Sequence, residues 1–389
     1  MKIKYAVLFI LLLLASACPA RETRHEVKGV WIATVQNLDW PSNPGLPPET
    51  QKAELTTMLD EFKAMGFNTV ILQVRPMADT FWPSELEPWS AYLTGTQGKD
   101  PGYDPLGFAV EEAHKRGLKI HAWFNPFRVK SDASKNPSEN HPAVKNKNWA
   151  VKYGNAIVYD PGSPEARKHI IEVITEAAAK YDIDGVHLDD YFYPYPISKK
   201  GREVPFDDAK SFKKYAAEGQ ALADWRRQNI NIFIDDLRES IKTVKPDMAF
   251  GISPFAVWRN ADECEDGSAT KGFSSYGTIF TDVNYWLDRG YLDYVVPQIY
   301  WSFDSGQKPF DKVLAWWANK ISSLKNPPAL YIGIAAYKHG DTYNKKEIEK
   351  QIKYARKLKT VGGFIYFRAQ NVLNDDKKLK TGIKKLNKT

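Results

Sequence analysis

The sequence predicts an α/β fold, a single (β/α)8 barrel of the TIM type. Eight short apolar runs recur along the 389 residues, several of them rich in β-branched side chains, and helical patterns separate them. Parallel strands covered on both faces need such continuous apolar character, and eight strand–helix units are enough to close a barrel. A doubly wound open sheet is the alternative, and the lack of Gly-x-Gly-x-x-Gly after the first run disfavours it.

The eight apolar runs are the predicted barrel strands. In chain order they span residues 29–35, 68–74, 118–124, 185–189, 249–253, 294–299, 330–335 and 363–367. Three intervening stretches have clear helical signals. Residues 49–65 and 105–116 each stop before a glycine, and residues 164–180 begin with Ser163 as N-cap and Pro164 in the first turn.

Two predicted loops are much longer than the usual few residues. Residues 126–159 follow the third strand, and residues 191 to about 228 follow the fourth. Both leave the carboxyl ends of strands, which is the face where barrel enzymes build their active sites. We therefore expect these loops to form the walls of a substrate groove.

The first residues resemble a bacterial export signal. Lys2 and Lys4 precede an apolar run over residues 6–14 that is too short to span a membrane, and small residues lead to Cys18. Cys18 stands where a lipobox cysteine would be lipidated, and an ordinary cleaved signal with a chance cysteine is the alternative. The predicted organisation is a signal peptide at 1–17, a lipidated linker at 18–26, the barrel domain at 27–373 and a Lys-rich tail at 374–389. This predicts an exported protein, lipid-anchored to the bacterial cell envelope.

Composition narrows the function classes. Setting aside Lys2 and Lys4 leaves a net charge of +5, a mild excess concentrated in the tail, so no nucleic-acid partner is expected. Cys264 is the only cysteine besides Cys18. Neither a Gly-x-Ser-x-Gly elbow nor a Walker loop occurs, and His121 and His187 lack the partners of a His-Glu-x-x-His site, so we expect no cofactor and no metal.

Carboxylates mark the end of the fourth strand, within residues 184–191. Side chains alternate along a strand, so Asp189 is expected on the barrel axis beside His187, which would orient it. Asp190 would point the other way or lie in the following turn, where it could cap a helix. Cleavage of a glycosidic bond typically needs two carboxyl groups, one to protonate the leaving oxygen and one to attack or activate water. The strand end therefore predicts a glycosidase, although turn and cap roles for both aspartates are the alternative.

The partner of Asp189 in catalysis is open at this point. Asp190 and Asp304 are the candidates, with Asp304 first among the acids that follow other strands because it comes after a polar and aromatic strand end; Asp39 and Asp79 rank below it. Other side chains are expected to bind the substrate. Polar contacts to the sugar are predicted for Arg75, Asn125, His187, Gln298 and Tyr300, and stacking on sugar rings for Trp40, Trp82, Tyr193 and Trp301.

Several motif blocks together resemble the glycosyl hydrolase-like 10 family. They lie at residues 29–35, 37–42, 73–76, 121–126, 184–194, 251–255 and 296–301, and the likeness runs from about residue 27 to about residue 370. The resemblance implies a barrel that hydrolyses amino-sugar glycan strands stripped of their stem peptides and is attached to an envelope membrane by lipid. It places His187, Asp189 and Asp190 on the family's catalytic strand. Hydrolysis of a dietary or host polysaccharide, and a glycan-binding lipoprotein without turnover, are the alternatives.

Overall fold

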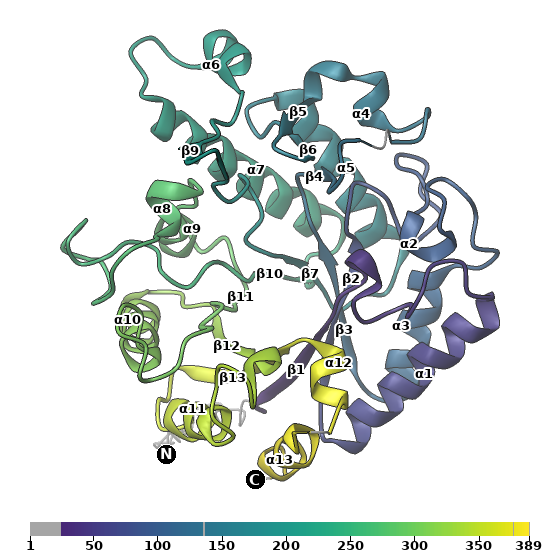
Figure 1. Cartoon of the computed structure of the whole chain (residues 1–389), viewed down its shortest axis with the longest axis vertical. Helices are drawn as coiled ribbons and strands as arrows, with labels where there is room; N and C mark the ends of the chain where they lie inside the picture. Colours follow the sequence, from purple (N-terminus) through teal and green to yellow (C-terminus); the bar gives the residue numbers. More distant parts are fainter. Residues whose placement is uncertain (1–24, 135–136, 376, 389) are drawn as a thin grey trace, which may run out of the picture.

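The computed structural model describes residues 25–134, 137–375 and 377–388 and has a closed eight-stranded barrel at its centre. Every neighbouring pair in the barrel is parallel, in the order β1-β13-β12-β11-β10-β7-β3-β2 (Figure 1). The predicted (β/α)8 barrel is thus confirmed. The strands are β1 Val27–Ile32, β2 Thr69–Arg75, β3 Lys119–Phe124, β7 Gly185–Leu188, β10 Ala249–Ile252, β11 Tyr294–Val295, β12 Ala329–Ala335 and β13 Val361–Phe367.

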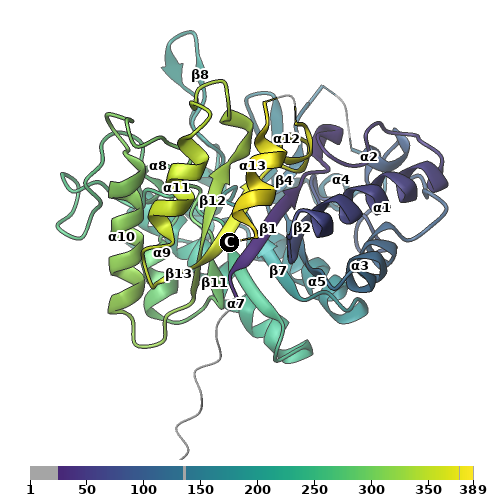
Figure 2. The same ribbon diagram turned by 90° about the horizontal axis from the view of Figure 1, so that it is seen from below.

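Helices surround the barrel and bury one apolar stripe each against the strands (Figures 1 and 2). The Ser163 hydroxyl caps α5 by accepting from the Ala166 N–H at 3.2 Å, as the sequence predicted. No described helix is long and apolar enough to cross a membrane. The larger helices are α1 Pro48–Ala64, α3 Pro105–Lys115, α5 Pro164–Lys180, α7 Leu222–Val244, α9 Val283–Asp288, α10 Phe310–Ser323, α11 Glu347–Ala355 and α13 Leu379–Leu386.

The segments after β3 and β7 are the long loops that the sequence predicted, and both carry structure of their own. The first holds a three-stranded sheet in the order β4-β6-β5, and the second holds a hairpin of β8 and β9. The remaining elements are β4 Arg128–Lys130, β5 Ala150–Tyr153, β6 Ala156–Tyr159, β8 Ser198–Lys199, β9 Arg202–Glu203, α2 Ala91–Thr94, α4 Pro142–Lys145, α6 Ala209–Tyr215, α8 Ser275–Thr278, α12 Ala369–Leu373 and the 3-10 turns Val35–Asn37, Lys147–Trp149 and Ala336–Lys338.

Four strands, β1, β7, β10 and β11, end earlier than predicted, and two of these ends bear on the site. β11 stops at Val295 because Pro297 has no N–H to donate to a neighbouring strand. Pairing resumes only as an isolated bridge of Gln298 with Phe255 and Gly333. β7 stops at Leu188, so the backbone is already irregular at Asp189 and Asp190. The alternation of side chains that holds within a strand therefore does not apply to these two aspartates.

The last helix packs against the barrel domain. Leu379 and Ile383 are buried, and the Asn387 side chain donates to the Met65 carbonyl at 3.2 Å. The lysines of this segment, such as Lys384 and Lys385, lie exposed on the opposite face. The helix α13 thus belongs to the same packed unit as the barrel.

A polar column fills the lower part of the barrel, where many barrels have branched aliphatic side chains. Tyr294 Oη lies 2.8 Å from His121 Nδ1 and 3.0 Å from His187 Nδ1. Glycines make the room for these rings. A Cβ at position 251 would lie 2.2 Å from the Tyr294 ring, and one at position 185 would lie 2.7 Å from His121 Nδ1.

Candidate active site

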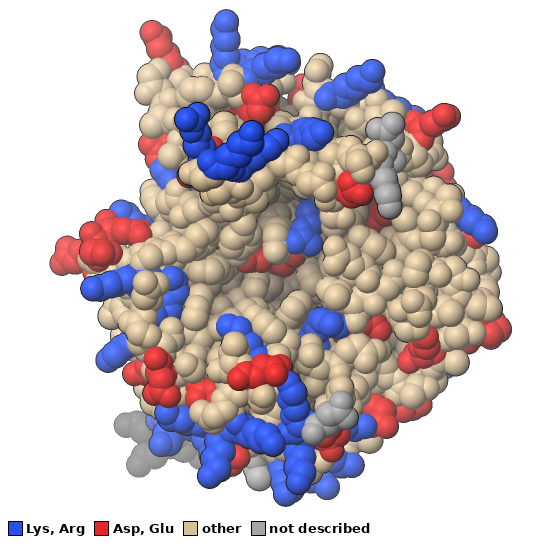
Figure 3. Space-filling view, viewed as in Figure 1, with Lys and Arg blue, Asp and Glu red and all other residues tan. Residues whose placement is uncertain are grey.

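The carboxyl end of the barrel opens into a cavity of about 660 Å³, the mouth cavity, lined by Asp189 and Asp190 together with many aromatic side chains. Figure 3 shows this face hollowed at its centre, with acidic and basic atoms inside the hollow. Its aromatic lining includes Trp31, Trp123, Tyr191, Tyr195, Tyr300, Tyr337 and Phe367. A concave, mostly apolar cavity with a few polar groups is what small ligands and single sugar rings need.

Asp189 is held by a chain of amides that crosses four neighbouring strands. The Gln73 side chain accepts from the Thr34 and Val35 N–H groups, each at 2.8 Å, and donates to Asn125 Oδ1. The Asn125 amide in turn donates to Asp189 Oδ2. The Tyr191 N–H donates to the other carboxyl oxygen, Oδ1, at 3.2 Å. Because each link starts from a different strand end, the position of the carboxyl group is fixed by the barrel itself.

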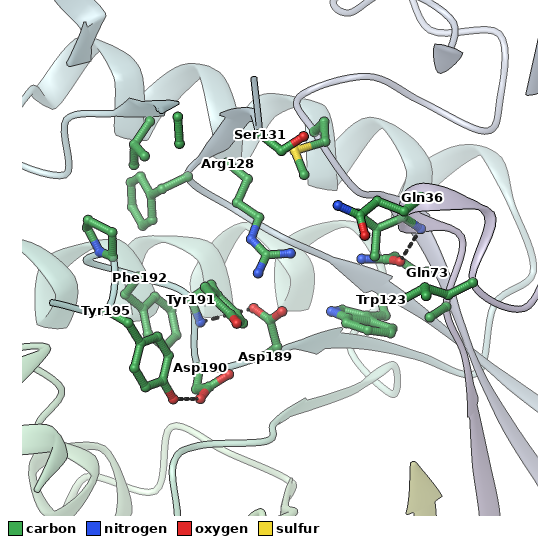
Figure 4. A pocket seen from close by; sticks show the side chains of 18 of the residues that line it. Gln36, Gln73, Trp123, Arg128, Ser131, Asp189, Asp190, Tyr191, Phe192 and Tyr195 are labelled. Atoms are coloured by element: carbon green, nitrogen blue, oxygen red, sulfur yellow. Dashed lines mark hydrogen bonds between the residues drawn. The ribbon is translucent and has the colours of Figure 1, made fainter. Parts of the chain in front are cut away.

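Asp190 lies beside Asp189 in the same cavity and has partners of its own. The Tyr195 hydroxyl donates to Asp190 Oδ2 (Figure 4), and the Gln298 side chain also hydrogen bonds to this carboxyl group. Gln298 is itself fixed, since its amide donates to the Ser253 carbonyl at 2.8 Å. Of the two expectations for Asp190, the one that it points away from the axis is wrong, because it lines the cavity, whereas it does lie after the end of β7.

Both carboxyl groups have pKa values above those of ordinary aspartates. The pKa of Asp189 is raised to about 7, because burial outweighs the opposing charge of Arg128 and the neighbouring Asp190 adds to the rise. Burial also raises the pKa of Asp190, and the hydrogen bonds from Tyr195 and Gln298 oppose that rise. Two like charges this close in a site shielded from water cannot both form easily. Near neutral pH the pair therefore holds on to a proton.

Arg128 brings a positive charge to this pair. It begins β4 in the long loop after β3, and its guanidinium carbon lies 3.5 Å from the centre of the Tyr191 ring. Figure 4 shows the side chain reaching toward Asp189 and Tyr191. Within the described residues no carboxylate forms an ion pair with Arg128, so its N–H groups face the cavity.

Arg128 is not among the residues predicted from the sequence. The available signal was its place three residues after Asn125, at the start of the long loop. Trp31 was missed as well. A tryptophan inside a parallel barrel strand was the signal there, because small and branched residues are commoner at such positions.

His187 does not contact Asp189 or the substrate cavity. It is fully buried in the polar column, where its Nε2 accepts from the Trp31 indole N–H at 3.2 Å and lies 3.0 Å from the Ser253 hydroxyl. An indole nitrogen can only donate, so the proton of His187 is on Nδ1 and is donated to Tyr294. Burial lowers the pKa of His187, which keeps the ring neutral. The predicted orienting role belongs to Asn125 instead.

Several predicted substrate contacts are core residues. Arg75 is completely buried in an ion pair with Glu87, with an Nη2–Oε1 distance of 2.5 Å, and Glu87 also contacts His169. Trp40 and Trp82 are fully buried and donate to Gln51 and Glu176, and Tyr193 packs between Phe206 and Phe280. These four predictions are wrong because apolar packing and buried ion pairing account for the residues.

Of the other predicted residues, Gln298 and Tyr300 line the mouth cavity, whereas Asn125 lies behind Asp189. Trp301 packs on Phe255 and does not line the cavity. Asp304 is exposed and outside it, which corrects its candidacy as second acid. Asp39 is buried in an ion pair with Arg368. Asp79 lies in a neighbouring cavity.

Solved structures share this architecture. The glycoside hydrolase domain of PgaB (BpsB) from Bordetella bronchiseptica superposes with a TM-score of 0.61 at 14% identity, covering 92% of this chain and 98% of that one. The catalytic domain of β-amylase from Paenibacillus polymyxa gives a TM-score of 0.59 at 12% identity, over 93% and 97% of the two chains. At these identities the likeness concerns the fold.

Sequence comparison gives much closer relatives. The glycosyl hydrolase YngK of Bacillus subtilis (strain 168) is 45% identical over 361 residues, which is 90% of this chain and 69% of that protein. The glycosyl hydrolase DigH of Escherichia coli (strain K12) is 36% identical over 377 residues, 90% of this chain and 84% of that protein. The model of the glycosyl hydrolase-like 10 family matches residues 26–351. This chain belongs to the glycosyl hydrolase-like 10 family and is a glycoside hydrolase.

Proposed function

We propose that this enzyme cleaves glycosidic bonds in peptide-free peptidoglycan strands, with Asp189 and Asp190 as its acid–base pair. The observation that carries the mechanism is the pair itself, two buried carboxyl groups with raised pKa values in an aromatic cavity. Glycosidic cleavage needs one protonated and one ionised carboxyl group on the scissile bond. A pair that shares a proton near neutral pH meets this requirement.

The roles follow from the surroundings of each carboxyl group. Asp189, with a pKa of about 7, carries a proton over much of the neutral range and is the proposed general acid. Asp190 accepts from the Tyr195 hydroxyl and from Gln298, and such donors favour the carboxylate form. It is the proposed base or nucleophile. Partly exposed aromatic faces of the lining, such as Tyr195 and Tyr337, would hold the sugar rings over the pair.

The choice of glycan rests on the family resemblance and on Arg128. In peptidoglycan the stem peptide is joined by an amide bond to the lactyl group of one of the two alternating amino sugars, and its removal leaves a carboxylate. Arg128 offers a guanidinium that forms no ion pair with a carboxylate in the described part of the chain, although it contacts Tyr191, and guanidinium groups bind carboxylates with two parallel hydrogen bonds. In intact peptidoglycan this carboxyl group is an amide, so the charge is lost and a peptide must also be accommodated.

Export and lipid anchoring remain part of the proposal, although residues 1–24 lie outside the described part of the chain. Two lysines, a short apolar run and small residues before Cys18 support it. We expect Cys18→Ser to move the protein from the membrane fraction to the soluble fraction of the cell. A variant that still sediments with membranes as the parent does would contradict anchoring at this cysteine.

Removal of either carboxyl group should lower turnover strongly. We expect Asp189→Asn and Asp190→Asn each to lower kcat by about a hundredfold or more, because a general acid or base acts mainly in the transition state. Products from peptide-free strands, intact sacculi and a plant-glycan panel would be analysed by mass. Asp304→Asn is the matched control and should keep parental activity.

Two outcomes would contradict these roles. If Asp190→Asn keeps most of its activity and loses about 1 kcal/mol of stability, Asp190 serves only as a capping residue. No product from any glycan, with the parent protein folded, would favour a binding protein.

Activity should fall as the pH rises above neutrality. The pKa of Asp189 is raised to about 7, and a general acid works only while protonated, so kcat/KM should decline above about pH 7. The Arg128 charge lowers this pKa, so Arg128→Gln should shift the decline to higher pH. Both profiles would be measured on an uncharged glycan. A flat profile from about pH 6 to about pH 9 would contradict Asp189 as the acid.

Arg128 should also determine the preference for stripped strands. Hydrogen bonds to a charged group contribute about 1.5–3 kcal/mol, so Arg128→Gln should raise KM for peptide-free strands by about tenfold or more. Strands in which that carboxyl group is amidated should show no matching loss, so the ratio of the two kcat/KM values should shrink. Arg238→Gln, on the outer face of α7, is the control. An unchanged ratio would show that Arg128 serves only the carboxyl pair.

A further inference from the structure

A second cavity of about 580 Å³ lies beside the mouth cavity. The two cavities share four lining residues, Gln36, Met77, Lys130 and Ser131, and therefore adjoin each other at these residues. The second cavity is bounded on its far side by α2 and the turn after it, including Tyr92 and Thr96. Its size is within the range of ligand sites.

Asp79 gives this second cavity an unusual polar group. The residue is 2% exposed, and its Oδ2 accepts from Gln97 Nε2 at 3.1 Å and from the Ala91 N–H at 3.4 Å, while the Ser90 side chain also hydrogen bonds to the carboxyl group. Oδ1 has no hydrogen-bond partner in the described part of the chain, and the nearby Ser138 hydroxyl has none there either. A buried polar atom without a partner costs about 1–3 kcal/mol, and more if it is charged. A ligand that donates to Oδ1 would remove that cost.

The chemistry of Asp79 selects the kind of ligand. A carboxylate accepts hydrogen bonds from hydroxyl and amide N–H groups and repels anions. Burial raises the pKa of Asp79 to about 6, so the group is still mainly ionised at neutral pH. Tyr92, partly exposed in the same cavity, offers a ring against which a sugar can pack. A neutral sugar unit with hydroxyl and acetamido groups fits these features, and Asp79 with the neighbouring Asp132 disfavours a free carboxylate there, even though Lys130 also lines the cavity.

We infer that the second cavity is a further glycan subsite, which takes a neutral sugar unit of the strand whose scissile bond lies over Asp189, with Asp79 Oδ1 accepting from that unit. The inference rests on the proposed amino-sugar substrate. It adds a directional element to the groove, because Arg128 attracts an acidic unit in the mouth cavity and Asp79 favours a neutral one beyond the shared wall. In a strand that alternates acidic and neutral sugars, the two charges would set the register of cleavage.

Binding as a function of chain length tests the subsite. Titration calorimetry would use the inactive Asp189→Asn protein with oligosaccharides from disaccharides to octasaccharides, in one series of peptide-free peptidoglycan fragments and one of neutral N-acetylglucosamine oligomers. Affinity should rise with length until the second cavity is filled. Adding Asp79→Ala should remove that rise, with a loss of about tenfold for long glycans and none for disaccharides. Asp304→Ala, added in the same way, should have no effect.

A second variant separates binding from folding. Thr96 is exposed at the rim of the second cavity, so Thr96→Trp would fill the space while leaving Asp79 and its partners in place. It should weaken long glycans selectively, as Asp79→Ala does. Two results would overturn the subsite. One is a binding affinity of the parent that does not depend on glycan length. The other is an Asp79→Ala variant that loses affinity equally at all lengths while Thr96→Trp has no effect. The neutral oligomers test the subsite independently of the peptidoglycan proposal. That proposal fails if the fragments with free carboxylates bind no better than the neutral oligomers.

Discussion

Two neighbouring carboxyl groups, Asp189 and Asp190, are kept out of water at the mouth of the barrel, and the rest of the site depends on this constraint. Burial makes the charged forms unfavourable, so each carboxyl group needs donors and the pair retains a proton. The structure supplies the donors from different strand ends, Asn125 after β3 and Gln298 after β11. The ends of four neighbouring strands thus hold Asp189 in place.

The polar column inside the barrel supports the same pair of carboxyl groups from below. His121, Tyr294 and His187 form a hydrogen-bonded column that runs up to Trp31 and Ser253, both of which line the mouth cavity. Because both histidines have lowered pKa values and each hydrogen bond has a defined direction, the column adds no charge beneath the carboxyl pair. The floor of the site is therefore rigid and neutral, and the cavity holds the charges.

The walls of the site come from the inserted segments. β4 places Arg128 over Tyr191, and the loop after β7 places Tyr195 against Asp190. Arg128 offsets part of the repulsion between the carboxyl groups and leaves donors for an anionic ligand, whereas Asp79 adds a negative charge in the adjoining cavity. Charged groups thus line both cavities, Arg128 with the carboxyl pair in the first and Asp79 in the second. Such an arrangement suits a polymer whose units differ in charge.

The sequence by itself determined the barrel, its eight strands, the long loops after the third and fourth strands and the presence of Asp189 at the end of the fourth strand, because apolar periodicity and helix caps are local signals. Only the tertiary structure decided which polar residues share the cavity. Arg75, Trp40 and Trp82 were predicted to bind substrate, yet each has a partner distant in sequence that buries it, and His187 belongs to the column beneath. Asp190 joined the site because β7 ends one residue before Asp189, which a two-residue periodicity cannot reveal. Tertiary packing fixes the positions of these side chains, and local sequence patterns do not predict that packing.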